Sequence, residues 1–189
     1  MNVTRRLALG LLGTVFAVGC AGGPAPLQAL DRPIELERFM GPWYVVAHIP
    51  IDLPFASEAN AYEGVETYAL LPNGEIDIVY EYRDGSFEAP LESLPQRGWV
   101  HDPTNRTEWR VQFLWPFRSA YLIAWVDDDY RRAIVGVPSR DYAWILSRDA
   151  VVEDAELDAL SGRLENLGYD LAGLRRVPQR PASNAPASP

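Results

Sequence analysis

Residues 41–49 read Gly-Pro-Trp-Tyr-Val-Val-Ala-His-Ile, and they decide how this chain folds. Gly41 and Pro42 are residues typical of turns, and an apolar run follows them directly. This order predicts a turn that leads into a β-strand over 43–49, whose first large side chain is Trp43. We expect the later strands to curl round and meet this tryptophan.

Apolar residues alternate with polar ones in several segments between residues 62 and 148, which is typical of strands with one buried face. Seven further strands are predicted, over 62–70, 75–82, 97–101, 107–113, 120–126, 131–137 and 142–148. Asn73-Gly74 is the strongest hairpin signal between them, and we expect 87–95 to be irregular. Eight antiparallel strands in series predict an all-β fold, an eight-stranded up-and-down β-barrel.

The periodicity changes after the last predicted strand. Four leucines at helical spacing predict a C-terminal α-helix, namely Leu157, Leu160, Leu164 and Leu167. Gly168 predicts where this helix ends, and we expect the helix to pack on the outside of the barrel. The tail over 178–189 is rich in Pro, Ala and Ser, and we expect it to be disordered.

The N-terminus has the pattern of an export signal. Arg5-Arg6 precede an apolar stretch over 7–18, which is too short to be a reliable membrane span. Small residues before Cys20, the only cysteine, resemble a bacterial lipobox. This resemblance implies that 1–19 is a lipoprotein signal peptide and that Cys20 carries the lipid, with acyl chains such as palmitate. The alternative is an ordinary signal peptide with an accidental cysteine, and Sec or twin-arginine export stays open.

The lipobox resemblance also predicts where the protein resides. Ala21 follows the cysteine where an aspartate would change the sorting, which favours an anchor in the bacterial outer membrane, facing the periplasm. The domain is expected over 34–177, and residues 20–33 are expected to form a flexible tether. A lipidated Cys20 leaves no thiol for a disulfide, so burial must stabilise the fold.

Charge and composition argue against several classes of function. The net charge is -9, and all 17 basic residues are arginines that form no basic stripe, so no nucleic-acid partner is expected. Neither His48 nor His101 belongs to a metal-binding motif, and no Gly-x-Ser-x-Gly motif is present, so we expect no enzyme, metal or cofactor. We expect His48 to be a strand histidine that faces outward, and a haem bound to His48 is the alternative. Asp127-Asp128-Asp129 favours a hairpin turn over a metal site.

Three motifs in order resemble the signatures of the lipocalin family. They are Gly41 and Trp43 after a short helical turn, Asp129-Tyr130 between two late strands, and Arg148 at the end of the eighth strand. The segments 138–148, 71–78 and 115–117 resemble those of the bacterial outer-membrane lipocalins. The resemblance runs from Glu35 to Val177.

Two departures from the family pattern affect the prediction of the ligand. Pro42 stands where the family often has threonine, and the first residue of a strand tolerates this change. Residues 79–82, Val-Tyr-Glu-Tyr, replace a more polar stretch that contains asparagine.

The resemblance implies a barrel with one closed end and one open end. Arg148 would pack over Trp43 at the closed end, in a cation–π contact worth about 1 kcal/mol. The loop over 50–55 would cover the open mouth as a lid. The ligands implied are fatty acids, lysophospholipids or similar amphiphiles.

Alternation along the predicted strands selects the side chains that point inward. The predicted ligand-binding residues are Ile76, Ile78, Tyr80, Trp109, Val111, Phe113, Tyr121 and Trp144. Their abundant aromatic rings favour an apolar cavity with a few polar groups. The alternative is that these side chains merely fill the core. Arg110 or Arg118 could meet a headgroup, although a solvated surface position is the expectation for both.

Two further functions stay open. The protein could be an envelope scaffold whose barrel is filled and whose surface binds a partner, with Ile51, Leu53 and Phe55 as docking residues. It could also be an enzyme on a lipocalin fold. The sequence leaves the choice between a monomer and a homodimer open as well.

Overall fold

The structure of this chain, a computed structural model, describes residues 25–53 and 56–181. The predicted signal peptide over 1–19, Cys20 and the tail beyond residue 181 lie outside these residues. In the described part, no helix is both long and apolar enough to cross a bilayer.

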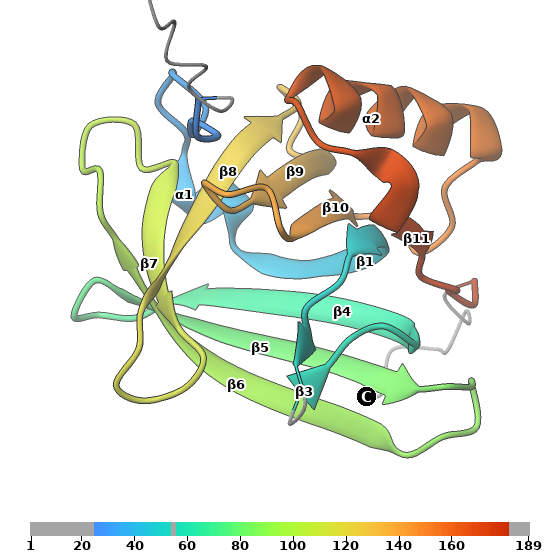
Figure 1. Cartoon of the computed structure of the whole chain (residues 1–189). Helices are drawn as coiled ribbons and strands as arrows, with labels where there is room; N and C mark the ends of the chain where they lie inside the picture. Colours follow the sequence, from blue (N-terminus) through green and yellow to red (C-terminus); the bar gives the residue numbers. More distant parts are fainter. Residues whose placement is uncertain (1–24, 54–55, 182–189) are drawn as a thin grey trace, which may run out of the picture.

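Eight antiparallel strands form a closed barrel (Figure 1). They are β1 (Gly41–Ile49), β4 (Ala61–Leu70), β5 (Glu75–Asp84), β6 (Leu91–Val100), β7 (Glu108–Gln112), β8 (Ser119–Val126), β9 (Arg132–Gly136) and β10 (Ala143–Ser147). From β4 to β10 each strand pairs with the next in the chain, and β1 pairs with both β4 and β10. Two short strands, β2 (Asp52–Leu53) and β3 (Ala56–Ser57), form a separate hairpin between β1 and β4. The predicted eight-stranded up-and-down barrel is confirmed.

The start of β6 differs from the prediction of irregular structure over 87–95. The strand begins at Leu91 and pairs with β5 over residues 91–99, from Arg83 opposite Leu91 to Glu75 opposite Trp99. Its first residues are mostly exposed and show no clear alternation. Pairing with β5 therefore sets this strand, where the local pattern carries no signal.

The closed end of the barrel is a cluster of aromatic rings. The short helix α1 (Leu36–Phe39) places Phe39 5.1 Å from Trp43 and 5.6 Å from Trp109, measured between ring centroids. The indole N–H of Trp43 donates to the carbonyl of Phe39 at 2.8 Å. The guanidinium of Arg148 lies 3.8 Å above the ring of Trp43, so the contact that the resemblance implies is present.

The turn between β8 and β9 is held by the first residue of the aspartate run. Asp127 accepts hydrogen bonds from the backbone N–H groups of Arg131 and Arg132, at 2.7 and 3.0 Å. The hydroxyl of Tyr130 accepts from the backbone N–H of Glu35 at 2.7 Å and so joins this turn to α1. Asp129 is exposed. The run is therefore a hairpin turn, as predicted.

Helix α2 (Asp154–Asn166) packs against the outer face of the barrel (Figure 1). Leu160 and Leu164 are buried there in a second core, which β1, β8, β9 and β10 share. Gly168 ends the helix in a backbone conformation with φ of +88°, which glycine adopts without strain. The predicted C-terminal helix and its outside position are confirmed.

The predicted flexible tether is wrong for the part that the structure describes. The backbone N–H of Leu27 donates to Pro138, and that of Leu30 donates to Ile123, both at 2.9 Å. Leu27 is only 3% exposed because its side chain enters the second core beside α2. Residues 27–33 are therefore fixed to the barrel by burial and backbone hydrogen bonds.

The predicted disorder from residue 178 onward is wrong over 178–180. After the 3-10 helix η1 (Leu171–Gly173), strand β11 (Arg175–Arg176) pairs with β1. The side chain of Gln179 then donates to the carbonyls of Val45 and Gly64, at 2.9 Å each, where β1 and β4 no longer pair. These bonds satisfy carbonyl groups that would otherwise lack a partner in the ladder.

Candidate functional site

The barrel encloses a cavity of about 480 Å³ on the side away from the aromatic cluster around Trp43 at the closed end. This volume lies in the usual range for small-molecule sites. The cavity is lined by Ile51, Ser57, Glu58, Glu66, Tyr80, Leu94, Gln96, Val111, Phe113, Ser119, Ala120, Tyr121, Val137, Pro138, Ser139, Tyr142 and Trp144. Ile51 belongs to the predicted lid loop, whose residues 54–55 lie outside the described part.

Five of the eight predicted ligand-binding residues line this cavity. They are Tyr80, Val111, Phe113, Tyr121 and Trp144. The other three, Ile76, Ile78 and Trp109, are completely buried in the core and do not line it. Alternation selects the inward face of a strand correctly, but it does not give the height along the barrel. Near the closed end the inward side chains pack on one another and leave no space.

Neither arginine that was considered for a headgroup lines the cavity. Arg110 pairs with Glu108 at 2.7 Å. The guanidinium of Arg118 lies 3.8 Å over the ring of Trp99, whose indole N–H donates to Glu75. Both therefore occupy ordinary surface contacts, and none of the residues that line the cavity is basic.

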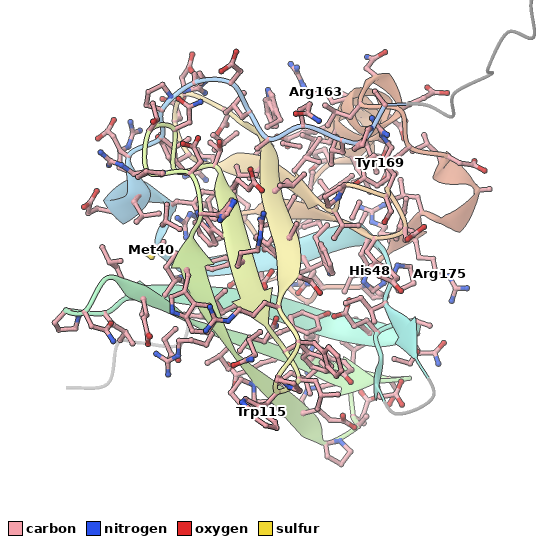
Figure 2. The ribbon with its side chains drawn as sticks, turned by 60° about the vertical axis from the view of Figure 1, so that its left-hand side comes forward. Met40, His48, Trp115, Arg163, Tyr169 and Arg175 are labelled. Atoms are coloured by element: carbon pink, nitrogen blue, oxygen red, sulfur yellow. The ribbon has the colours of Figure 1, made fainter. Side chains whose placement is uncertain are left out.

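His48 points into the barrel, which corrects the expectation of an outward-facing histidine. A bulge in β1 lies between Val45 and Ala47, opposite β10, so an extra residue enters the strand there. The bulge reverses the alternation, and His48 comes to lie opposite Trp144 and is 1% exposed. Burial lowers the pKa of His48 to about 4, with a smaller contribution from Arg175, which lies beside it (Figure 2).

Two buried glutamates in the cavity wall were missed by the sequence analysis. Glu58 lies just before β4 and is 8% exposed, and Glu66 lies within β4 and is 5% exposed. The indole N–H of Trp144 donates to Glu58 at 3.0 Å. The hydroxyl of Tyr121 donates to Glu66 at 3.2 Å. Glu66 has the same parity in its strand as the buried Tyr68, and this parity is the signal that could have placed it inside.

Burial controls the protonation of these two carboxyl groups. Desolvation raises the pKa of Glu58 to about 7, although the hydrogen bond from Trp144 opposes it. Desolvation likewise raises the pKa of Glu66 to about 7, against the hydrogen bonds from Tyr68 and Tyr121. Each carboxyl group therefore changes its charge near neutral pH. The charge of Glu66 raises the pKa of Glu58 further, so the two groups influence each other.

The tyrosine hydroxyls around the carboxyl groups complete a polar cluster inside apolar walls. The hydroxyls of Tyr68 and Tyr121 are hydrogen-bonded to each other. Burial raises the pKa of Tyr68, Tyr80 and Tyr121 well above the usual value, so all three stay protonated at neutral pH. The hydroxyl of Tyr80 is buried and has no hydrogen-bond partner in the described structure. The Nδ1 atom of His48 is also buried and also has no hydrogen-bond partner there.

The arrangement suits non-covalent binding. Within residues 25–53 and 56–181, no group of three or more His, Cys, Asp or Glu side chains is placed to hold a metal ion. The Nδ1 atom of His48 and the Oε2 atom of Glu58 are 3.8 Å apart, too far for a hydrogen bond. What the cavity offers a ligand is apolar surface, aromatic faces and a small set of acidic and hydroxyl groups.

Comparisons with known proteins agree with this architecture. Residues 34–179 match the family model described as a lipocalin-like domain. The chain is 30% identical to temperature-induced lipocalin-1 of Arabidopsis thaliana over 156 residues, which cover 78% of this chain and 81% of that protein. It is 27% identical to the outer membrane lipoprotein Blc of Escherichia coli strain K12 over 170 residues, which cover 89% and 93%.

Solved structures share the fold at lower identity. Apocrustacyanin C2 matches with a TM-score of 0.58 and 14% identity, over 77% of this chain and 80% of its own. The major allergen Per a 4 from cockroaches matches with a TM-score of 0.58 and 17% identity, over 82% and 95%. With the family model matched over most of its length and a closed eight-stranded barrel, this chain belongs to the lipocalin family.

Proposed function

We propose that this lipocalin binds a single-chain lipid, such as a fatty acid or a lysophospholipid, while a lipid on Cys20 anchors it in the bacterial outer membrane, facing the periplasm. The observation that carries the proposal is the cavity of about 480 Å³, whose walls are mainly apolar and aromatic. Each CH₂ group of an acyl chain buried there would gain about 0.8 kcal/mol, less the cost of ordering the chain. No catalytic step is part of the proposal.

The relatives support the location. The matching protein from Escherichia coli is named an outer membrane lipoprotein. A plant lipocalin matches as well, so the family alone does not determine the compartment. The anchor therefore depends on Cys20 and the apolar stretch before it.

The path of the N-terminal segment supports an anchor close to the cavity mouth. The carbonyl of Ala25 accepts a hydrogen bond from Arg140 at 2.7 Å, and Leu27 is bonded to Pro138. Pro138 also lines the cavity. Ala25 comes five positions after Cys20 in the chain, and five extended residues span at most about 18 Å. A lipid on Cys20 would thus hold the mouth near the bilayer surface.

The loop between β7 and β8 would face the same bilayer. It runs from Phe113 to Arg118, and both Phe113 and the first residue of β8, Ser119, line the cavity. Trp115 at the tip of this loop is 80% exposed (Figure 2), and Phe117 is 70% exposed. Exposed aromatic side chains beside a ligand mouth suit contact with lipid.

A fluorescence titration tests ligand binding. Residues 21–189 would be titrated with a lysophospholipid and with a long-chain fatty acid, and tryptophan emission would be followed. Trp144 lines the cavity, so we expect saturable quenching in the micromolar range or tighter. A Trp144→Phe variant should lose most of this signal. A folded protein that responds to neither ligand would favour the scaffold function instead.

Cell fractionation tests the anchor. The full chain should be found in the outer membrane, and Cys20→Ser should release it into the soluble periplasmic fraction. A Cys20→Ser variant that remains in the membrane would contradict the lipid anchor and leave the ligand-binding proposal standing.

A further inference from the structure

Two acidic groups inside a lipid-binding cavity narrow the choice of ligand. Glu58 and Glu66 are more than nine-tenths buried, and both line the cavity. A fatty acid or a lysophosphatidic acid with its head bound beside them would bring a further negative charge into a site of low dielectric, where like charges repel strongly. Residues that serve only as core would be expected to be apolar at these positions.

The cavity offers no positive charge that could compensate an anionic head. Its lining contains no arginine or histidine, and the chain has no lysine. His48 lies next to Glu58, but its lowered pKa of about 4 keeps it neutral at physiological pH. Arg175, which lies beside His48, donates to the carbonyl of Ala59 and is exposed.

The aromatic rings around the two carboxyl groups suit a cation. Tyr121 and Trp144 are stacked with their centroids 6.0 Å apart, and each is hydrogen-bonded to one of the glutamates. Aromatic faces attract ammonium groups, most strongly where water is excluded. The hydroxyl of Tyr80 adds a buried acceptor without a partner, and the charges of Glu58 and Glu66 both act on it.

We propose that the cavity selects amphiphiles with an ammonium head, bound with the cation inward beside Glu58 and Glu66 and with the hydrocarbon chain toward the mouth. The cation points inward because Glu66 lies deep in the barrel, where it pairs in register with Trp43 of the aromatic cluster at the closed end. Ile51, Val137 and Pro138, from loops beyond the strand ends, offer apolar surface to the chain. This inference rests on the proposed function, because it specifies which lipid-like ligand the same cavity takes.

Protonation gives the proposal a pH signature. An ammonium ion needs ionised carboxylates, and both glutamates have a pKa of about 7, so binding at neutral pH displaces protons from them. The other titratable groups that interact with them are His48, Tyr68, Tyr80, Tyr82 and Tyr121, and these keep their neutral form throughout this range. Affinity for an alkylammonium should therefore rise between pH 5.5 and pH 8.

Isothermal titration calorimetry with three ligands of equal chain length tests the proposal. Dodecylamine, dodecan-1-ol and dodecanoate would be titrated into the mature chain, residues 20–189, with Cys20→Ser to prevent acylation. At pH 8 dodecylamine should bind about tenfold or more tightly than dodecanoate, as a charge-assisted contact predicts. At pH 5.5 this preference should shrink. Repeating the titration at pH 7 in buffers of different ionisation enthalpy should reveal proton release with dodecylamine.

Variants locate the effect in the cavity. Glu58→Gln and Glu66→Gln should each weaken the binding of dodecylamine by about tenfold and strengthen the binding of dodecanoate. The matched control is Glu81→Gln, which changes a carboxylate on the outward side of β5 and should leave all three affinities unchanged. Proton release by the unmodified protein provides a second test if a variant does not fold.

The outcomes separate this inference from the proposed function. Equal affinity for dodecylamine and dodecanoate at pH 8 would overturn the ammonium preference but leave lipid binding intact. Dodecylamine binding without proton release, unaffected by both glutamate variants, would also overturn it. Failure of all three ligands to bind a folded protein would refute lipid binding itself, and the ammonium preference with it.

Discussion

The guanidinium group of Arg148 lies 3.8 Å over the indole ring of Trp43 and also donates hydrogen bonds to four backbone carbonyls of the segment before and at the start of β1. These carbonyls belong to Arg38, Phe39, Met40 and Pro42, at 2.9, 3.1, 2.8 and 2.6 Å. One side chain therefore joins the end of β10 to the turn that begins the barrel.

Arg148→Ala should lower the free energy of unfolding by about 3 kcal/mol, because the cation–π contact and the hydrogen bonds from a charged group are lost together. Ligand affinity should stay nearly unchanged, since Arg148 does not line the cavity. Urea denaturation and ligand titration measure the two effects. Arg97→Ala, which removes only surface ion pairs, is the control and should cost less than about 1 kcal/mol. A stable Arg148→Ala variant with lost binding would contradict the assignment of this end as the closed one.

Leu27→Ala tests whether the N-terminal segment is part of the domain. Leu27 is buried against the second core, so truncating it should lower the free energy of unfolding by about 2 kcal/mol. Leu91→Ala offers the contrast, because Leu91 is 53% exposed and should have little effect. Equal stability of the two variants in chemical denaturation would mean that this segment is a loose tether after all.

The sequence determined the barrel because its strands carry a clear period of two. In β5 the inward residues are apolar or aromatic, and the structure buries each of them, as with Ile76 and Tyr82. The same pattern could not say which of them reach the cavity. Ile76 and Tyr80 share a face, yet only Tyr80 lines the cavity, since the position along the barrel axis depends on the tilt and register of all eight strands.

The errors at the site have specific physical causes. The bulge after Val45 reverses the alternation of β1, and this turns His48 inward without any signal in its own neighbourhood. Glu66 looks like a solvent-facing residue because a charge inside a barrel is costly, and its burial depends on hydrogen bonds from distant residues such as Tyr121. Tertiary contacts of this kind cannot be read from one strand at a time.

Gly136 is a position where any side chain would collide with Tyr169. A Cβ atom there would lie 1.9 Å from the hydroxyl oxygen of Tyr169, which accepts from the N–H of Val137 and donates to the carbonyl of Tyr142. Gly136→Ala should therefore lower the free energy of unfolding by about 3 kcal/mol, at the upper end for overpacking.

Two further variants separate this collision from a general effect of replacing glycine. In a Tyr169→Phe background the hydroxyl is gone, so Gly136→Ala should cost clearly less, and a double-mutant cycle measures the difference. Gly162→Ala in α2 meets nothing within 4 Å and should stabilise the protein by about 1 kcal/mol through helix propensity. An equal cost of Gly136→Ala in both backgrounds would show that the hydroxyl is not the obstacle.

Glu66 should make the stability of the protein depend on pH. Its pKa is about 7 in the folded state and 4.5 as an ordinary glutamate, so the folded state holds the proton more tightly. Between these two pH values the folded protein binds more protons than the unfolded chain, and stability falls as the pH rises through this window. Above pH 7 the loss is complete, because the carboxylate is then ionised in both states.

Glu66→Gln removes this dependence, since glutamine has no proton to lose. Relative to the unmodified protein, the variant should gain about 2 kcal/mol of stability between pH 5 and pH 8. Glu58 and His48 are present in both proteins, so their own pH dependence largely cancels in the comparison. Urea denaturation at each pH measures the difference. Glu81→Gln is the control, and its stability relative to the unmodified protein should not change with pH. A stability difference that is constant from pH 5 to pH 8 would mean that Glu66 is exposed to water in the folded protein. It would contradict the presence of a buried carboxyl group at this position of the cavity.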